Sequence, residues 1–526
     1  MLLLALTLGG CSAPRRTPGV AASWLAGHPM PAFDPDGPPD ALRVALERQL
    51  SRGLVERDAG GRVRPALADS IGVSRDSLTW TFRLRAGMRF TDGSVVTSGH
   101  IRDALAGGLA RGDHATREWL LAAIQGVSKV RVGRPVPALG IETPDGRRLV
   151  LRLASPDRRL LEKLAVPGVS TPWRRRSGTW RDAVGVGPYR VAAGEGERSL
   201  TLVRASPVAG VRAAADTLRI RFLGGAIRVR NILRRSGADV LWPVPPGFLE
   251  PGLPSGWELL RASAGPDRRL LLVLRADVPP LTQAAAREAL ARAIRREQLL
   301  AALDGLGEPL PRWLPGANEP YEWPRLEWAA ERVDRLAGEA AERADVAPAA
   351  PRRVERTPTL LGSYHVTLAF DADLSGAIVA PVLQGQWAAA GHYADLRALH
   401  GSEALAQPLK AAAPQAALVE SQALLPGLEA ELAFLVAPIR GPARGGFRTG
   451  WRTREYDPWL LPPGPRTELN ADALQRAIAA DRIVLPIASL PWVVGVRAGA
   501  PRPDVHPAFG PDWTVPDAAA GSARTR

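Results

Sequence analysis

The sequence predicts an α/β protein of several domains, in which open sheets are covered by helices. A chain of 526 residues is too long for one hydrophobic core, so two or three domains are expected. Residues 270–274 form a continuous apolar run, which is typical of a strand covered on both faces. Residues 283–303 repeat apolar side chains at helical spacing, with arginines and glutamates on the opposite face. Alternating strand and helix patterns favour open α/β lobes, in which ligands bind at the carboxyl ends of the strands.

The elements follow from local patterns along the chain. Residues 78–84 alternate apolar and polar side chains, which predicts a half-buried strand, and the turn dipeptide Asp92-Gly93 follows it. A second amphipathic helix is expected over residues 325–343, and a proline- and alanine-rich linker or loop over 347–358. The other predicted strands are residues 149–153, 218–222, 366–370 and 432–437.

The charge of the chain is high, but its distribution argues against a nucleic-acid partner. The formal net charge is +15, whereas the apolar content of 46% and the charged content of 23% are ordinary for a globular protein. Only three lysines occur, and the arginines are spread along the whole chain together with abundant alanine, glycine and proline. This skew is typical of a GC-rich coding bias. We therefore predict no nucleic-acid binding.

The only cysteine lies near the start of the sequence and predicts an exported, lipid-anchored protein. Cys11 ends the segment MLLLALTLGGC, whose short apolar run before two glycines resembles the lipobox of bacterial lipoproteins. In that resemblance residues 1–11 include the signal peptide, and Cys11 is the lipidated residue. The alternative is a buried thiol in a cytosolic protein. No other stretch approaches the ~20 apolar residues of a membrane span, so the membrane contact expected is the lipid anchor alone.

A series of motifs then resembles a known family. Gly53-Leu54-Val55-Glu56 precedes residues 65–70 (PALADS), and the strand ends in residues 81–90 (TFRLRAGMRF) before Asp92-Gly93. This run resembles the family 5 extracellular solute-binding proteins, which capture peptides, nickel complexes and related solutes for ABC importers. Two departures are Thr91, where a histidine is usual, and Gly99-His100, which replaces an acidic residue.

The resemblance continues in the same order along most of the chain. Residues 185–189 (GVGPY) are similar to a family turn, and residues 287–294 to a family helix, with Arg295 in place of an aspartate. The remaining similar segments are residues 123–126 with 140–141, residues 232–240, and residues 483–487. Six motifs in the family's order identify the chain as a member. The strand and turn at residues 78–93 are thus a mark of the scaffold.

The resemblance implies a two-lobed periplasmic-binding-protein-like fold with an additional inserted domain and a hinge between the lobes. It also implies a monomer without a cofactor, which captures a small, peptide-like solute for the permease subunits of an ABC transporter. The expected location is the bacterial cell envelope, on its periplasmic or extracellular face. The implied domains are a discontinuous lobe I (residues 12–51, 166–263 and 482–526), an inserted domain (52–165) and lobe II (264–481).

An enzyme finds little support in the motifs. None of the seven histidines forms an H-E-x-x-H pattern, and no G-x-S-x-G elbow, P-loop or C-x-x-C is present. His392 and His400 lie eight residues apart, with Tyr393 and Asp395 between them, and a surface role is expected for them in preference to a metal site. We predict no metal site and no catalytic residues. A hydrolase remains the weaker alternative.

Fifteen tryptophans raise a second ligand class. Several of them lie in proline- or glycine-rich surroundings, where a broad aromatic face is suited to stacking on a peptide or a sugar. These are Trp313, Trp323, Trp451, Trp459 and Trp492. An oligosaccharide or another non-peptide ligand is therefore the alternative to a peptide, and a divergent member without a transport role is a further one.

The segment 446–459 (GFRTGWRTREYDPW) carries the prediction of the ligand contact. Peptide-binding members carry an R-x-GW-x-x-D motif, whose aspartate pairs with the ligand's α-ammonium. Arg448, Gly450 and Trp451 match this motif, but Arg454 occupies the aspartate's place. Trp459 ends the segment.

A second register is possible, in which residues 455–457 match a later family segment. The ligand loop is then residues 438–446, which contain Arg440 and Arg444 and no acid. Both registers replace the acid by arginine. We therefore predict a site that favours an anionic or neutral group over a free α-ammonium.

Overall fold

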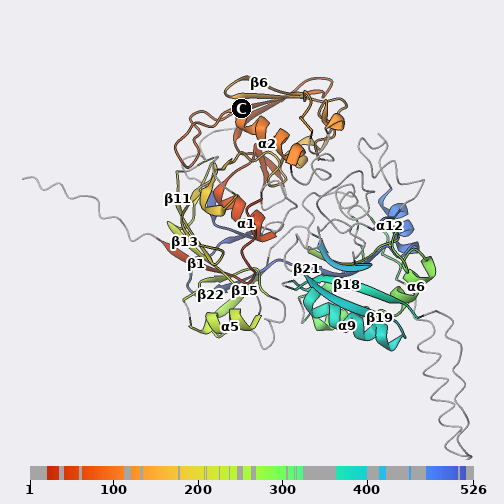
Figure 1. The fold of residues 1–526 in the computed structure, drawn as a ribbon. Helices are drawn as coiled ribbons and strands as arrows, with labels where there is room; N and C mark the ends of the chain where they lie inside the picture. Colours follow the sequence, from red (N-terminus) through yellow and green to blue (C-terminus); the bar gives the residue numbers. More distant parts are fainter. Residues whose placement is uncertain are drawn as a thin grey trace, which may run out of the picture.

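The structure is a computed structural model that describes the chain from residue 20 to residue 516 with gaps. Most of its strands belong to three sheets, of seven, six and four strands. In Figure 1 the seven-stranded sheet lies on one side, the four-stranded region with α2 and β6 lies above it, and the six-stranded sheet lies on the other side. Among the described residues, no helix is both long and apolar enough to cross a membrane. The described residues are 20–34, 41–58, 62–111, 120–130, 134–175, 178–206, 208, 210–223, 226–235, 237–245, 253–261, 268–303, 306–312, 314, 317–323, 363–372, 374–399, 414–421, 449–451, 470–506 and 510–516.

The seven-stranded sheet has the order β10-β11-β13-β1-β14-β22-β15. Its central strand β1 pairs in parallel with β13 and β14, while β22 is antiparallel to β14 and β15. Helix α1 (Ala41–Leu50) packs on one face together with Trp24 and Trp513, and helix α5 (Ala226–Arg235) packs on the other face through Val229 and Leu233. The strands are β1 (Ala21–Ala26), β10 (Tyr189–Glu195), β11 (Ser199–Arg204), β13 (Thr217–Phe222), β14 (Val240–Leu241), β15 (Trp257–Arg261) and β22 (Val493–Arg497).

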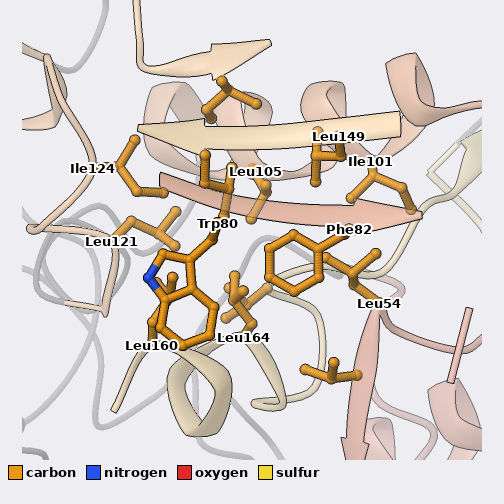
Figure 2. Packing of buried hydrophobic residues seen from close by; sticks show 14 of the residues in the cluster. Leu54, Trp80, Phe82, Ile101, Leu105, Leu121, Ile124, Leu149, Leu160 and Leu164 are labelled. Atoms are coloured by element: carbon orange, nitrogen blue, oxygen red, sulfur yellow. The ribbon is translucent and has the colours of Figure 1, made fainter. Parts of the chain in front are cut away.

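The four-stranded sheet, in the order β4-β5-β7-β6, contains the alternating stretch that predicted a strand. β5 (Thr79–Leu84) buries Trp80, Phe82 and Leu84 and exposes Arg83, so that prediction is confirmed. Figure 2 shows Trp80 and Phe82 packed among leucines and isoleucines of the surrounding elements. The other elements here are β4 (Ala68–Val73), β6 (Ile141–Asp145), β7 (Arg148–Arg152), α2 (Ser98–Arg111) and α4 (Leu160–Leu164).

The six-stranded sheet has the order β17-β21-β16-β20-β18-β19. All side chains of Leu270–Leu274 in β16 are buried, alternately in the clusters on the two faces of the sheet, which confirms the prediction of a strand covered on both sides. β18 pairs in parallel with β19 and β20, whereas β16 is antiparallel to β20 and β21. The elements are β16 (Arg268–Leu274), β17 (Glu308–Pro309), β18 (His365–Asp371), β19 (Tyr393–Leu399), β20 (Ala416–Ser421), β21 (Val484–Leu490), α6 (Ala284–Arg292), α7 (Arg296–Ala302), α9 (Gly376–Ala389) and α12 (Ala471–Ala480).

Short elements complete the described part of the chain. They are β2 (Val55–Arg57), β3 (Val63–Pro65), β8 (Arg174–Arg175), β9 (Ala183–Val184), β12 (Val211–Ala213), β23 (Asp504–His506), β24 (Gly510–Asp512), β25 (Thr514–Pro516), and the 3₁₀ turns Val127–Lys129 and Trp180–Asp182. The strand predicted at 432–437, the helix at 325–343 and the linker at 347–358 lie outside the described residues.

The single helix predicted over residues 283–303 is wrong, because the chain breaks into α6 and α7. Arg295, between them, has an extended backbone. The side-chain amide of Gln386 in α9 satisfies both of its backbone groups: the Arg295 N–H donates to Gln386 Oε1 (3.0 Å), and Gln386 Nε2 donates to the Arg295 carbonyl (3.1 Å). A helix can end where its free backbone groups find such partners.

The C-terminal part of the chain changes sheets later than predicted. β21 pairs with β16 in the six-stranded sheet, and β22 pairs with β14 and β15 in the seven-stranded sheet. The crossing therefore occurs at Pro491-Trp492, whereas the predicted lobe boundary falls between residues 481 and 482. The boundary differs from the prediction because residues 484–490 pair with β16, and the sequence of β21 alone does not reveal this partner.

A buried group of charges fastens the last strands to α1. Arg48 of α1 pairs with Asp512 of β24 (Nη2–Oδ2 3.0 Å), and both side chains are nearly buried. Burial acts to raise the pKa of Asp512, but the charges of Arg48 and Arg52 outweigh it, so the pKa of Asp512 is below its ordinary value. The ionised carboxylate therefore stabilises the folded chain above the pKa of the unfolded state, and this stability is lost as the pH falls through the lower folded pKa.

We predict that Asp512→Ala lowers the free energy of unfolding by about 3 kcal/mol, because it leaves the Arg48 guanidinium nearly buried without its carboxylate. Asp103→Ala removes the partner of Arg102 in an exposed pair and is the matched control, with an expected loss of about 1 kcal/mol or less. Urea unfolding of both variants at neutral pH measures the difference. Equal losses would contradict the stabilising role of the Arg48–Asp512 pair.

Candidate functional site at the edge between the two sheets

The candidate site is the edge where the chain passes between the two large sheets. One crossing runs from β15 to β16, and the other runs from β21 through Pro491-Trp492 to β22. The parallel strands β1, β13 and β14 on one side, and β18, β19 and β20 on the other, share one direction within their own sheets. β16 begins, and β20 and β21 end, at the same edge of the six-stranded sheet. Carboxyl ends of parallel strands are where open α/β sheets bind ligands.

Three tryptophans form a continuous group at this crossing. Trp492 lies between the sheets, and its ring centroid is 5.2 Å from that of Trp242, which directly follows β14. Trp242 in turn lies 5.9 Å from Trp24 of β1, whose indole N–H donates to the Trp242 carbonyl (2.7 Å). All three are buried. Aromatic contacts of this kind add stability beyond the burial of area, so the crossing is fixed to the seven-stranded sheet.

An ion pair fixes the same crossing to the six-stranded sheet. Arg268, at the start of β16, places its guanidinium carbon 4.3 Å from the Trp492 ring centroid and donates to Glu420 of β20 (Nη1–Oε2 2.6 Å). The second oxygen of Glu420 accepts from the backbone N–H of Ser375, just before α9 (2.6 Å). The carboxylate of Glu420 is buried and is satisfied on both oxygens. A cation over an aromatic face is attracted by the ring, so Arg268 joins the sheet to Trp492.

The sequence-predicted ligand residues are only partly described. Cys11, Arg440, Arg444, Arg448, Arg454 and Trp459 lie outside the described residues. Gly450 has a left-handed backbone (φ 64°), and a side chain there would collide with the carboxylate of Asp277. This close approach explains the glycine.

Trp451 lies away from the crossing. The carbonyl of Thr449, two residues before Trp451, accepts from the N–H of Ala276 (2.6 Å), which follows the end of β16. Arg268, which contacts the crossing, lies at the opposite end of that strand. The Trp451 side chain is 4% exposed, and its indole N–H donates to Asp481 (Nε1–Oδ2 2.7 Å). These contacts are with the core of the six-stranded sheet. A ligand contact by Gly450 and Trp451 therefore stays a prediction, and their described partners support a structural role.

The other tryptophans and the histidine with a sequence-based prediction have mainly structural neighbours. Trp492 is buried in the crossing, Trp323 is half-buried against Tyr321, and Trp313 lies outside the described residues. His392 is buried next to Tyr364, and its burial lowers its pKa, which differs from the surface role expected. Among the described residues, no three acidic, histidine or cysteine side chains are grouped so as to hold a metal ion.

Sequence reasoning missed Arg268, Glu420 and Trp242. The chain places 151 residues between Arg268 and Glu420, so no local spacing marks their contact. Arg268 and Arg269 just before the apolar run of β16 were the available signal, because an arginine that begins a buried strand needs a partner.

The comparisons with known proteins match this architecture. A family model described as "Bacterial extracellular solute-binding proteins, family 5 Middle" matches residues 62–421. The oligopeptide-binding protein OppA of Bacillus subtilis (strain 168) is 23% identical over 174 residues, which are 31% of this chain and 32% of OppA. The match thus spans about a third of that relative's length.

Solved structures resemble nearly the whole chain. The binding protein AgaA of "A.tumefacien R10", in complex with agropinic acid, has a TM-score of 0.70 at 19% identity and covers 93% of this chain and 96% of its own. The murein tripeptide binding protein MppA of Escherichia coli has a TM-score of 0.71 at 14% identity, with 94% and 97% covered. Haemophilus influenzae OppA, in complex with RPPGFSPFR, has a TM-score of 0.70 at 15% identity, with 94% and 98% covered.

These TM-scores show that the chain shares the fold of the three proteins. The two-lobed architecture predicted from the sequence is thereby confirmed. The family model covers more than half of the chain and includes most of the motifs that suggested the family. The chain therefore belongs to the bacterial extracellular solute-binding proteins of family 5.

Proposed function

We propose that the protein is the substrate-binding component of an ABC importer, which captures a small solute between its two lobes and delivers it to a membrane permease. The observation that carries this proposal is the arrangement of two large sheets, joined at one strand-end edge by two connections. Closure of such lobes encloses a ligand through changes at a few connecting residues. Binding without chemical turnover is the function that we propose, and the family match supports it.

Trp492 is the central residue of the proposed hinge. It contacts Trp242 on the seven-stranded side and Arg268 on the six-stranded side. Because both contacts are buried and close-packed, each sheet moves as a rigid body and the change of angle is confined to the connections. This arrangement suits a binding protein that alternates between an open and a closed form.

We predict that saturating ligand decreases the radius of gyration, because lobe closure brings the two large sheets together around the solute. X-ray scattering of the protein before and after ligand addition measures the change. The inserted-domain variant Arg83→Ala is the matched control and should close as the wild type does, because Arg83 is exposed on β5, far along the chain from both connections. An unchanged scattering curve at saturation would show that closure does not accompany binding.

The solute that we propose is peptide-like, with an anionic or neutral group where free peptides carry an α-ammonium. Proteins of similar structure differ in their ligands: AgaA is in complex with agropinic acid, MppA is a murein tripeptide binding protein, and Haemophilus influenzae OppA is in complex with the peptide RPPGFSPFR. Arg454 in the first register, or Arg440 and Arg444 in the second, supports the preference for an anionic group. An oligosaccharide ligand loses part of its support, because Trp451 and Trp492 use their faces and edges in core contacts.

We predict that short peptides with free amino termini bind weakly, and that their N-acetylated forms bind better. A free ammonium near Arg454 would meet like charge, which costs on the order of 1–4 kcal/mol in a partly desolvated cleft. Calorimetry with one tripeptide and its acetylated form tests this preference. Arg454→Asp should shift affinity towards the free amine, whereas Arg83→Asp, at an exposed position of β5, should not. Tight binding of the free-amine peptide by the wild type would contradict the prediction.

The lipid anchor is also proposed. Cys11→Ser should move the protein from the membrane to the soluble fraction, because no acyl chain can then be attached at that position. Cell fractionation with a wash at ~0.5 M salt, which screens electrostatic binding, measures the distribution. Ser12→Ala keeps the cysteine and should remain on the membrane. Recovery of salt-washed Cys11→Ser with the membrane would exclude Cys11 as the anchor.

A further inference from the structure

Helix α5 presents an outer face made of arginine. Its inner face packs on the seven-stranded sheet through Val229 and Leu233. Arg228, Arg234 and Arg235 are exposed, and helical geometry places them on the side opposite those two apolar residues. Within the described part of the chain these three arginines form no ion pair. A solvated surface helix usually mixes both signs of charge, whereas α5 contains no acidic residue.

The same face of the sheet continues this positive charge beyond the helix. Arg221 of β13 stands beside Leu25 of β1 in the strand register, and Leu25 belongs to the cluster beneath α5. Arg219, two residues earlier in β13, lies on the same face because side chains alternate along a strand. β13 leaves both arginines exposed.

Arg190 extends this surface to the edge strand. It pairs with Val203 of β11, which shares the face of Thr201 and hence of Arg219. Arg190 is also exposed. We call these six side chains the arginine face: Arg190, Arg219, Arg221, Arg228, Arg234 and Arg235. In Figure 1, β11 and β13 lie on the left of the seven-stranded sheet, and α5 lies below it, on the side away from α2 and β6.

Strands β10, β11 and β13 place one acidic residue, Glu195, on the side of the sheet that carries the arginine face. β11 contributes Ser199, Thr201 and Val203 to it, none of which is charged. The nearest paired acids are engaged: Asp216 binds Arg204 (2.7 Å) and the Val20 N–H, and Asp239 binds Arg497 and the Ser23 N–H. Glu195, the last residue of β10, pairs with Ser199 and so belongs to this face, whereas the charges of Glu197 and Arg198 in the turn that follows offset each other. Six like charges against this one acid leave a strongly positive surface, which attracts an anionic partner.

The partner that fits this surface is a membrane rich in anionic phospholipid. β1, the strand next to β13, begins at Ala21, ten residues after Cys11. Ten residues span at most about 35 Å, so an anchor at Cys11 would keep the arginine face close to the bilayer. The intervening segment adds Arg15 and Arg16. One lipid chain holds a protein only marginally, and a cluster of basic residues is a common second signal.

We propose that the arginine face binds the anionic headgroups of the membrane and holds lobe I against it, while the second lobe stays free to move. The proximity argument rests on the proposed anchor, but the binding itself does not require it. It is therefore tested on the full chain with Cys11→Ser, which carries no acyl chain. The charge complementarity predicts binding that falls steeply with salt, because the contacts are exposed.

The experiment measures sedimentation of this protein with vesicles of phosphatidylcholine alone and with added phosphatidylglycerol. Binding is expected only to the anionic vesicles at ~0.05 M salt, and it should be lost at ~0.5 M. Replacing Arg228, Arg234 and Arg235 by alanine should weaken the binding roughly 10- to 100-fold, because each basic residue near an anionic surface increases the affinity several-fold. Alanine is a good helix former, so α5 itself is preserved.

The matched control replaces Arg75, Arg83 and Arg134 by alanine. These arginines are exposed and form no ion pair with any other described residue, so the net charge falls by the same amount at a different place. Unaltered binding by this control and weakened binding by the α5 variant would support the arginine face. Equal effects of both variants, or equal binding to neutral and anionic vesicles, would overturn the proposal. It would also be overturned if the protein bound single-stranded DNA but no vesicles. Solute affinity measured by calorimetry should be the same for all three proteins, which separates a failure here from a failure of the proposed solute binding.

Discussion

The contact of Trp492 with Trp242 on one side and Arg268 on the other is the constraint on which the arrangement of the lobes depends. In the order of the described strands the chain passes between the large sheets twice, from β15 to β16 and from β21 to β22, so these passages determine how the sheets face each other. Trp492 is held by an aromatic neighbour 5.2 Å away and by a guanidinium 4.3 Å away, and that guanidinium is itself held by Glu420. A buried charge is tolerated only when it is paired, so the Arg268–Glu420 pair is what allows a cation to lie against the crossing.

The same contacts explain why the moving parts are confined. Glu420 also accepts from the backbone of Ser375, and in this way β16, β20 and the start of α9 share one carboxylate. Trp24, Trp242 and Trp492 tie β1, β14 and β22 together on the other side. In each sheet, non-covalent contacts thus hold the strand ends together in the absence of ligand. Because close-packed interiors are hard to deform, each sheet moves as a rigid body. The carboxyl ends of the strands that face the crossing remain the place where a solute can add contacts to both lobes.

Local patterns predicted the strands well, whereas features that depend on distant residues were missed. In β5 and β16 the pattern of a few consecutive residues is enough to predict which side chains are buried. The structure agrees with both predictions. The break between α6 and α7 depends on Gln386, 91 residues after Arg295, and no helical period reveals it. The motif at Gly450-Trp451 predicted a ligand contact, but the residues that occupy that place, Asp277 and Asp481, come from other parts of the chain. Burial of a tryptophan is a property of the whole fold, which is why a proline-rich neighbourhood said little about Trp492.

The arginines of this chain show how abundance and placement can have different causes. A coding bias accounts for many arginines and few lysines, and it predicts no particular arrangement of them. Yet Arg48 and Arg268, which are almost buried, are both paired with carboxylates, as the cost of an unpaired buried charge requires. On the surface this requirement is absent, because water solvates an exposed guanidinium, and arginines can accumulate on one face without a large cost to stability. Selection for stability therefore explains the paired arginines, while an arginine face with a large excess of positive charge, which gains nothing for folding, is better explained by a partner outside the chain.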